Sequence, residues 1–109
     1  MNLPDTFTLH ALDRVDSTIA EASRLAQLGA PHFTVIWARE QTAGRGRFNR
    51  PWRCDPGNLY CSVILRFDPG KQGVETLSLI AALATADTVE AYLDAPVRSR
   101  VKWVNDVLV

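Results

Sequence analysis

The segment QTAGRGRFNRPW, residues 41–52, holds the side chains best suited to chemistry in this sequence. Guanidinium groups bind phosphate or carboxylate oxygens through two parallel hydrogen bonds. Gly44 and Gly46 would let the backbone approach a ligand closely and adopt positive φ angles, and Trp52 can stack on a base. The segment therefore predicts an anion-binding loop that is mobile when empty and ordered by its ligand. Five arginines fall within fifteen residues, against the single acid Glu40: Arg39, Arg45, Arg47, Arg50 and Arg53.

The known phosphate-binding motifs do not match this segment. The Walker pattern needs Gly-Lys-Ser/Thr, and the dinucleotide fingerprint needs a glycine where Asn49 stands. Composition alone leaves three uses open: a solvated loop, a site for a small anion or nucleotide, and a nucleic-acid contact. The last is the weakest, because the rest of the chain shows no basic face.

Three other polar residues each have two possible uses. Ser17 and Thr18 start a predicted helix, so they either cap it or bind a polar ligand beside its exposed N–H groups. Lys102 is flanked by Val101 and Trp103 in a predicted strand. It is either an edge residue with a solvated ammonium or a pocket residue that holds an anionic oxygen. No Ser/His/Asp or Cys/His arrangement and no pair of carboxylates for acid–base catalysis is visible.

The composition describes an ordinary globular chain. Its 109 residues suit one small domain, and 47% of them are hydrophobic. Lys plus Arg and Asp plus Glu both number 12, so net charge indicates neither a nucleic-acid nor a membrane partner. No apolar run is long enough to cross a bilayer. Cys54 and Cys61 are expected to be free thiols, as in a reducing cytoplasm.

The first half of the chain predicts a strand, a helix and a second strand. The strands are expected at residues 7–15 and 33–40, the latter rich in β-branched and aromatic residues. Residues 16–29 predict the helix, with a capping box formed by Thr18 and Glu21. Its apolar face is expected to contain Ile19, Ala22, Leu25 and Ala26.

The second half predicts a strand, a long helix and a hairpin. After a loop to about Gly57, residues 58–67 alternate as a strand, which places five apolar side chains on one face: Leu59, Cys61, Val63, Leu65 and Phe67. Residues 74–93 predict a long, mostly buried helix. A strand at about 99–104, a turn at Asn105-Asp106 and a second strand complete the order β-α-β-loop-β-α-β-β. Because the chain stops inside an apolar strand, we expect a fragment of a longer protein.

Four segments together resemble the biotin protein ligases, also called biotin–[acetyl-CoA-carboxylase] ligases. They are VDST at 15–18, QTAGRGR with RPW at 41–52, GNLYCSVIL at 57–65 and VKWVND at 101–106. The resemblance implies an α+β fold with a mixed, largely antiparallel sheet flanked by helices, similar to class II aminoacyl-tRNA synthetases. It implies that residues 1–109 are the N-terminal portion of the catalytic domain, which is incomplete here.

The resemblance also implies an activity and its residues. Biotin and ATP with Mg²⁺ would give biotinyl-5′-adenylate, and the biotinyl group would pass to a lysine of a biotin carboxyl carrier protein. Arg47 and Lys102 would be catalytic and Asp106 would lie near the metal. The biotin contacts would be Ser17, Thr18, Gln41, Arg45, Gly46, Arg47 and Lys102, and the nucleotide contacts Arg47, Arg50, Trp52 and Asn105.

The sequence departs from the common pattern of these ligases at three places. Phe48-Asn49 replaces Arg-Gly, Ile19 replaces Asn, and Val104 replaces Pro. We expect the first to affect loop closure, the second to weaken biotin binding, and the third to alter a turn. The alternatives are a non-catalytic module that pairs through its terminal strand edge, including as a homodimer, and a lipoate-type ligase. The isolated chain is expected to show little or no turnover.

Overall fold

The computed structural model describes residues 2–109, which group into two compact units that divide between Phe67 and Asp68. The observed order of elements matches the predicted β-α-β-loop-β-α-β-β order, with two short 3₁₀ helices added. Each unit is described by itself below. Within residues 2–109, no helix combines the length and apolar character needed to cross a membrane.

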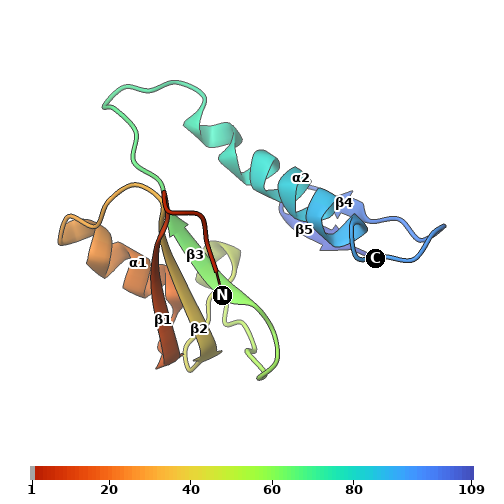
Figure 1. Ribbon diagram of the computed structural model, residues 1–109, viewed down its shortest axis with the longest axis horizontal. Helices are drawn as coiled ribbons and strands as arrows, with labels where there is room; N and C mark the ends of the chain where they lie inside the picture. Colours follow the sequence, from red (N-terminus) through yellow and green to blue (C-terminus); the bar gives the residue numbers. More distant parts are fainter. Residues whose placement is uncertain (1) are drawn as a thin grey trace. The chain divides into compact units, whose positions relative to one another are not determined.

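The first unit is a three-stranded sheet in the order β1-β2-β3 (Figure 1). β1 (Thr8–Val15) pairs in parallel with β2 (Thr34–Gln41), and β2 pairs antiparallel with β3 (Tyr60–Ile64). A parallel pair needs a crossover connection, and helix α1 (Thr18–Gln27) provides it by packing on β2 and β3. The core of this unit lies in β2 and β3, where Val35, Ile36, Ala38 and Ile64 are buried.

Both ends of α1 are held by side chains. Ser17 is the N-cap, and its Oγ accepts a hydrogen bond from the Ala20 N–H at 3.4 Å. At the other end, the Arg66 guanidinium donates to the carbonyls of Ala26 (2.9 Å) and Ala30 (2.6 Å). Ala26 lies in the last turn of the helix, where carbonyls lack partners within the helix, and Ala30 lies just after it. α1 is therefore fixed at its start, where β1 ends, and at its C-terminal end by the residue that follows β3 closely.

Two predictions for α1 are wrong. Thr18 is the first helical residue and not the cap, because its hydroxyl is hydrogen-bonded to Ser62 Oγ at 2.9 Å. Ile19 is 59% exposed, although the helical spacing placed it on the covered face. At the start of the helix that face holds Thr18, which is buried against the sheet.

The alternation of β3 is confirmed, but the strand is shorter than predicted. Tyr60, Ser62 and Ile64 are partly or fully buried, whereas Cys61 and Val63 are exposed. Residues 65–67 lie outside the strand, and Leu65 and Phe67 are exposed as well. Because α1 covers the face that carries Ser62 and Ile64, the side chains predicted to share one face are the uncovered ones.

The second unit contains one helix and a hairpin. Helix α2 (Leu77–Glu90) follows the 3₁₀ helix η2 (Val74–Thr76), and strand β4 (Arg100–Lys102) pairs antiparallel with β5 (Asp106–Leu108). α2 packs on both strands. The Glu90 carboxylate accepts hydrogen bonds from the Ser99 N–H at 2.9 Å and hydroxyl at 3.0 Å, which joins the helix end to the hairpin.

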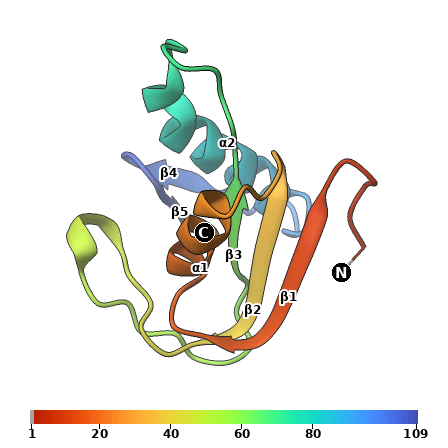
Figure 2. The ribbon, with the colours of Figure 1, turned by 90° about the vertical axis from the view of Figure 1, so that its left-hand side faces the viewer.

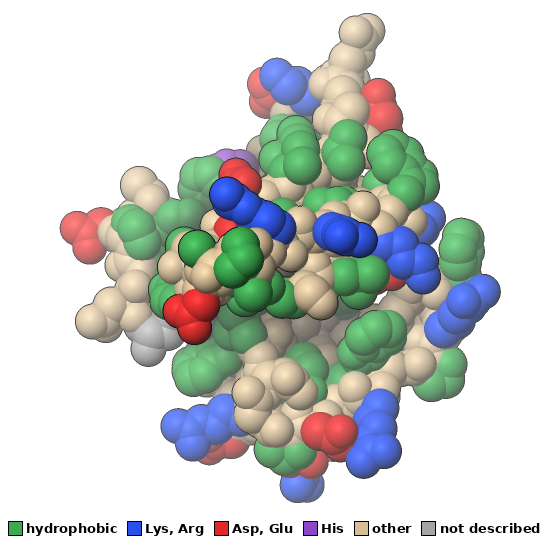
Figure 3. Space-filling model, turned by 90° about the vertical axis from the view of Figure 1, so that its right-hand side faces the viewer, with side chains coloured by type: hydrophobic (Ala, Val, Ile, Leu, Met, Phe, Trp, Pro, Cys, Tyr) green, Lys and Arg blue, Asp and Glu red, His purple; other side chains and the backbone are tan. Residues whose placement is uncertain are grey.

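The prediction that this helix is mostly buried is wrong. Only Ala82 and Ala86 are buried in α2, while Ile80 and Leu83 are about half exposed. Hydrophobic side chains also lie uncovered on the face of the molecule that Figure 3 shows, among charged ones. A helix that is apolar on all sides is typical of a position with neighbours on several faces. In this unit, β4 and β5 cover one face of α2.

The predicted hairpin is present, with a different turn. Trp103, Val104 and Asn105 connect the strands, and Asp106 is already the first residue of β5, opposite Lys102. Asn105 therefore lies in the turn as expected, and Asp106 does not.

Candidate functional site

The first part of the site forms where the ends of β1 and β2 lie beside the start of α1. Val15 at the end of β1 is the register partner of Gln41 at the end of β2, and α1 begins three residues after Val15. The chain leaving β2 stays attached there, because Thr42 N–H donates to the Val15 carbonyl (2.9 Å) and Ala43 N–H to the Asp16 carbonyl (2.7 Å). The sequence thus places the carboxyl ends of two parallel strands next to a helix N-terminus.

Gln41 joins these segments through its side chain. Its Oε1 accepts a hydrogen bond from the Thr18 N–H at 2.7 Å, which satisfies one of the unpaired N–H groups of the first helical turn. Thr18 and Ser17 are 4% and 5% exposed. The Thr18 hydroxyl is hydrogen-bonded to Ser62, while the Ser17 hydroxyl accepts from Ala20 and has no acceptor for its own proton within the described chain. Ser17 can therefore cap the helix and still donate to a ligand.

Asp16 fixes the entry to the helix. Its carboxylate accepts two hydrogen bonds from the Arg24 guanidinium, at 2.8 and 3.1 Å, and one from the Ser17 N–H at 2.8 Å. The Arg24 bonds, followed by the Ser17 bond, lower the pKa of Asp16 from 3.8 to about 2. Arg24 also pairs with Glu21, so its guanidinium is engaged by two carboxylates and is not directed at a ligand.

The second part of the site is the segment from Gly44 to Trp52, called the arginine loop below. It is folded as a narrow hairpin: Trp52 N–H donates to the Gly44 carbonyl (2.9 Å), and Gly46 N–H donates to the Arg50 carbonyl (2.8 Å). Its tip is the 3₁₀ helix η1 (Arg47–Asn49). Figure 2 shows this yellow-green loop projecting away from the sheet.

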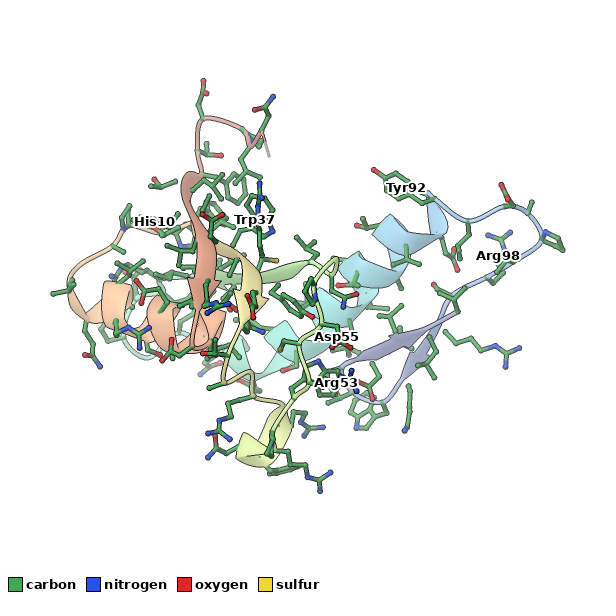
Figure 4. All side chains as sticks on the ribbon, turned by 90° about the horizontal axis from the view of Figure 1, so that it is seen from below. His10, Trp37, Arg53, Asp55, Tyr92 and Arg98 are labelled. Carbon is green, nitrogen blue, oxygen red and sulfur yellow. The ribbon has the colours of Figure 1, made fainter. Side chains whose placement is uncertain are left out.

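The arginines of the loop differ in their partners. Arg53 pairs with Asp55 at 3.0 Å on the segment that returns to β3, as Figure 4 shows, and Arg39 lies 3.8 Å from Asp13. No ion pair in residues 2–109 involves the three loop arginines, and all three are exposed: Arg45, Arg47 and Arg50. The arginine loop therefore presents three uncompensated positive charges.

Phe48 supports two of these charges. The Arg47 and Arg50 guanidinium carbons lie 5.1 and 6.0 Å from the centre of its ring. A cation over an aromatic face is attracted by the ring quadrupole, so the ring holds both guanidinium groups at the tip. Phe48 is itself 80% exposed.

The two loop glycines do not adopt the predicted conformation, and only Gly44 is required by its surroundings. Neither Gly44 nor Gly46 has a positive φ angle, and this prediction is wrong; the left-handed residues of the loop are Phe48 and Asn49, both at φ 58°. A Cβ at Gly44 would clash with Cys54 Sγ and lie 3.0 Å from the Trp52 carbonyl oxygen. The close approach of the two hairpin arms is therefore what requires glycine at position 44.

The second unit carries the remaining predicted residues at one end of its hairpin. Lys102 and Asp106 are register partners, Asn105 lies in the turn, and all three are exposed. Lys102 is thus solvated in this structure rather than desolvated in a pocket. Arg47 and Lys102 belong to different units, so the meeting of their charges at one ligand stays a prediction.

Two residues of the site were missed by sequence reasoning. Ser62 binds the Thr18 hydroxyl from β3, and Cys54 Sγ accepts a hydrogen bond from Gln41 Nε2 at 3.2 Å. The only available signal for Ser62 was that a hydroxyl interrupts the apolar run CSVIL. Nothing in the spacing of Cys54 marked it as a neighbour of Gln41.

Comparison with known proteins identifies similar chains. A family described as the biotin/lipoate A/B protein ligase family matches residues 11–109. The chain is 41% identical over 98 residues to the bifunctional ligase/repressor BirA of Bacillus spizizenii, covering 89% of this chain and 30% of that protein. It is 42% identical over 97 residues to the biotin–[acetyl-CoA-carboxylase] ligase of Paracoccus denitrificans, covering 89% and 40%.

Solved structures agree with this result. The biotin protein ligase from Aquifex aeolicus in complex with biotin and ATP matches with a TM-score of 0.75 and 31% identity, covering 94% of this chain and 41% of that one. The biotin protein ligase from Leishmania major in complex with biotinyl-5-AMP gives the same TM-score and identity, covering 97% and 48%. The chain therefore spans less than half the length of these relatives. The predicted α+β fold of the class II synthetase type is confirmed.

Proposed function

The chain belongs to the biotin/lipoate A/B protein ligase family, and on this basis we propose that it carries part of a biotin-activating site. In the proposed reaction, the biotin carboxylate attacks the α-phosphorus of ATP, pyrophosphate leaves, and biotinyl-5′-adenylate forms. A lysine of a biotin carboxyl carrier protein then takes the biotinyl group and releases AMP. Residues 1–109 would be the N-terminal portion of the catalytic domain.

The proposed roles follow the two parts of the site. Ser17, Thr18 and Gln41 bind the polar head of biotin at the start of α1, where Arg45 and Gly46 line the approach. Arg47 and Lys102 neutralise the carboxylate and the α-phosphate. The nucleotide side would be formed by Arg50, Trp52 and Asn105.

The chemistry suits a site without an acid–base residue. Adenylate formation brings a carboxylate against a triphosphate, so much of its barrier is charge repulsion and charge that develops on the phosphate oxygens. Positioned guanidinium and ammonium groups lower this barrier directly. The mixed anhydride product is easily hydrolysed, so a loop that closes over it would protect it from water.

Magnesium would arrive with ATP as part of the substrate. No group of three or more His, Cys, Asp or Glu side chains in the described chain could hold a metal ion. Mg²⁺ commonly binds one or two carboxylates together with substrate phosphates and keeps several waters. Asp106 offers one exposed carboxylate, as this mode of Mg²⁺ binding requires.

One observation carries the proposal: three arginines without acidic partners lie on a loop that begins three residues after Gln41. Unpaired guanidinium groups repel one another, and bound phosphate would relieve this repulsion. A solvated loop would need no such concentration of charge, and a nucleic-acid contact would need a wider basic surface.

Replacing Arg47 tests the proposal with a matched control. Arg47→Ala is expected to weaken retention of biotinyl-5′-adenylate more than tenfold, because a charge-assisted hydrogen bond contributes about 1.5–3 kcal/mol. Arg53→Ala removes an equal charge from a nearby position that is already paired with Asp55, and should change retention by less than about threefold. Calorimetric titration of the adenylate into each variant measures both. Equal affinities for all three proteins would refute the role of Arg47.

A second candidate is a module that pairs with a second copy of the chain through β5. This strand pairs only with β4 in the described chain, so its other edge is open, and open edges favour strand addition. Dimerisation that depends on concentration, with no response to biotin or ATP, would favour this function.

Lipoate ligation is the nearer alternative. Competition between biotin and lipoate for binding would separate a biotin ligase from a lipoate ligase. We further propose a cytoplasmic location, in keeping with two free cysteines.

A further inference from the structure

The Gln41 side chain is held in one orientation by two different partners. Its Oε1 accepts from the Thr18 N–H at 2.7 Å, and its Nε2 donates to Cys54 Sγ at 3.2 Å. A backbone N–H can only donate, so the carbonyl oxygen of the amide must face Thr18. The amide nitrogen then faces the sulfur, and its second hydrogen remains available.

The Cys54 thiol is itself fixed at the base of the arginine loop. Its S–H donates to the Trp52 carbonyl at 3.3 Å, and the sulfur fills the space that a side chain at Gly44 would occupy. Gly44 and Trp52 are hydrogen-bonded across the hairpin. Cys54 is half-buried. The thiol therefore touches both arms of the loop and the side chain of Gln41.

We propose that Cys54 is a positioning residue that orients Gln41 for its ligand and links this orientation to the base of the arginine loop. This proposal rests on the proposed function, in which Gln41 binds the polar head of biotin. The continuous path runs from Thr18 through Gln41 and Cys54 to Trp52. A movement of the hairpin arms shifts the acceptor of the thiol, and the Gln41 amide follows.

Three variants separate positioning from simple packing. Cys54→Ser retains a group that both donates and accepts hydrogen bonds. Cys54→Ala removes that group and Cys54→Val replaces it with apolar atoms. Cys61→Ser is the matched control, because Cys61 lies on β3 as the register partner of Trp37 and has no hydrogen bond to the site.

The first measurement needs no ligand. In ¹⁵N-resolved NMR spectra of the chain, the side-chain amide signal of Gln41 should move toward its position in a free amide in Cys54→Ala and Cys54→Val. It should stay near its original position in Cys54→Ser and Cys61→Ser. An unchanged Gln41 signal in Cys54→Ala overturns the proposal, as does a signal in Cys54→Ser that moves as far.

The second measurement is biotin affinity by calorimetry, with the thermal midpoint recorded for each variant. Cys54→Ala should weaken binding about threefold to tenfold, the effect of one neutral hydrogen bond, and Cys54→Ser should restore most of this loss. Affinities that follow the thermal midpoint rather than the Gln41 signal would overturn the proposal. A wild-type chain that binds no biotin would count against the proposed function, while the Gln41 signal would still decide the positioning role.

Discussion

Gly44 illustrates how single residues determine the geometry of this site. Its φ angle is not positive, so its lack of a side chain serves close approach. The hairpin arms of the arginine loop meet there, with Cys54 and Trp52 on the opposite side. At Gly46, an added Cβ would make only an ordinary contact, 3.4 Å from the Trp52 ring. Two glycines separated by a single residue thus differ in the destabilisation that a substitution would cause.

Gly44→Ala is therefore expected to destabilise the protein, and Gly46→Ala is not. Overpacking of this kind costs about 1–3 kcal/mol, whereas Gly46→Ala should change the free energy of unfolding by about 0.5 kcal/mol or less. Urea denaturation measures both. The double variant Gly44→Ala with Cys54→Ala should recover part of the loss, because the clashing sulfur is gone. Equal effects at the two glycines would contradict this explanation.

Asp16 gives the site a defined dependence on pH. Its pKa is lowered from 3.8 to about 2 in the folded state, chiefly by Arg24, so the folded state binds fewer protons than the unfolded state between these values. The stabilisation is complete above about pH 4 and is lost as the pH falls toward 2. Denaturation midpoints from pH 5 to 2 should fall more steeply for the wild type than for Asp16→Asn. Parallel curves would show that the Arg24 contact contributes nothing.

At the scale of elements, the tip of the arginine loop depends on left-handed backbone at two non-glycine residues, Phe48 and Asn49. Asn adopts this conformation more readily than other residues with a side chain. Gly, which the resemblance to the biotin protein ligases leads us to expect at position 49, suits the same angles. The turn therefore tolerates Asn at position 49. At Phe48 the left-handed backbone is unfavourable, and the ring of this residue lies beside two guanidinium groups.

Substitutions at Asn49 test this backbone requirement. Asn49→Val should destabilise the fold by about 1–2 kcal/mol, because a β-branched residue is strained at a φ angle of 58°. Asn49→Gly should leave stability within about 0.5 kcal/mol of the wild type. The free energies of unfolding of the two variants provide the comparison. A valine variant as stable as the glycine variant would show that the tip adopts another conformation.

The order of elements could be predicted from sequence because each element has a strong local pattern, alternation in β3 and an Ala/Leu-rich run in α2. The sequence did not indicate which face of each element would be covered. Alternation identifies two faces of β3 but not the one that α1 packs on, and α2 is apolar on every side. The choice between Ser17 and Thr18 as cap depended on Ser62, which is 44 residues from Thr18.

For the candidate site, motifs within one segment could be predicted from the sequence, and contacts between segments could not. The arginine loop, Gln41 and the helix start are contiguous motifs, so their sequence was informative. The Gln41–Cys54 contact joins residues 13 apart through a hairpin whose shape is a product of folding. The sequence also overestimated the number of unpaired positive charges, because Arg39 and Arg53 have acidic partners. Only the folded chain shows that three of the five arginines are uncompensated.

Over the full length of the chain, the residues proposed to bind ligand are divided between the two units. Gln41 and the arginine loop belong to the first, and Lys102, Asn105 and Asp106 to the second. If one ligand joins them, biotin and ATP together should order both units, whereas each compound alone should affect mainly its own contacts.

Hydrogen–deuterium exchange with biotin and ATP, separately and together, shows whether the arginine loop and the Lys102 hairpin both respond to the ligands. The Gly46 and Trp52 amides close the arginine loop and should exchange more slowly when both compounds are present, as should the hairpin around Lys102. Exchange in the middle of α1 should stay the same and serves as the internal reference. If the arginine loop and the Lys102 hairpin exchange at the same rates with and without the two compounds, these segments do not bind biotin and ATP as proposed.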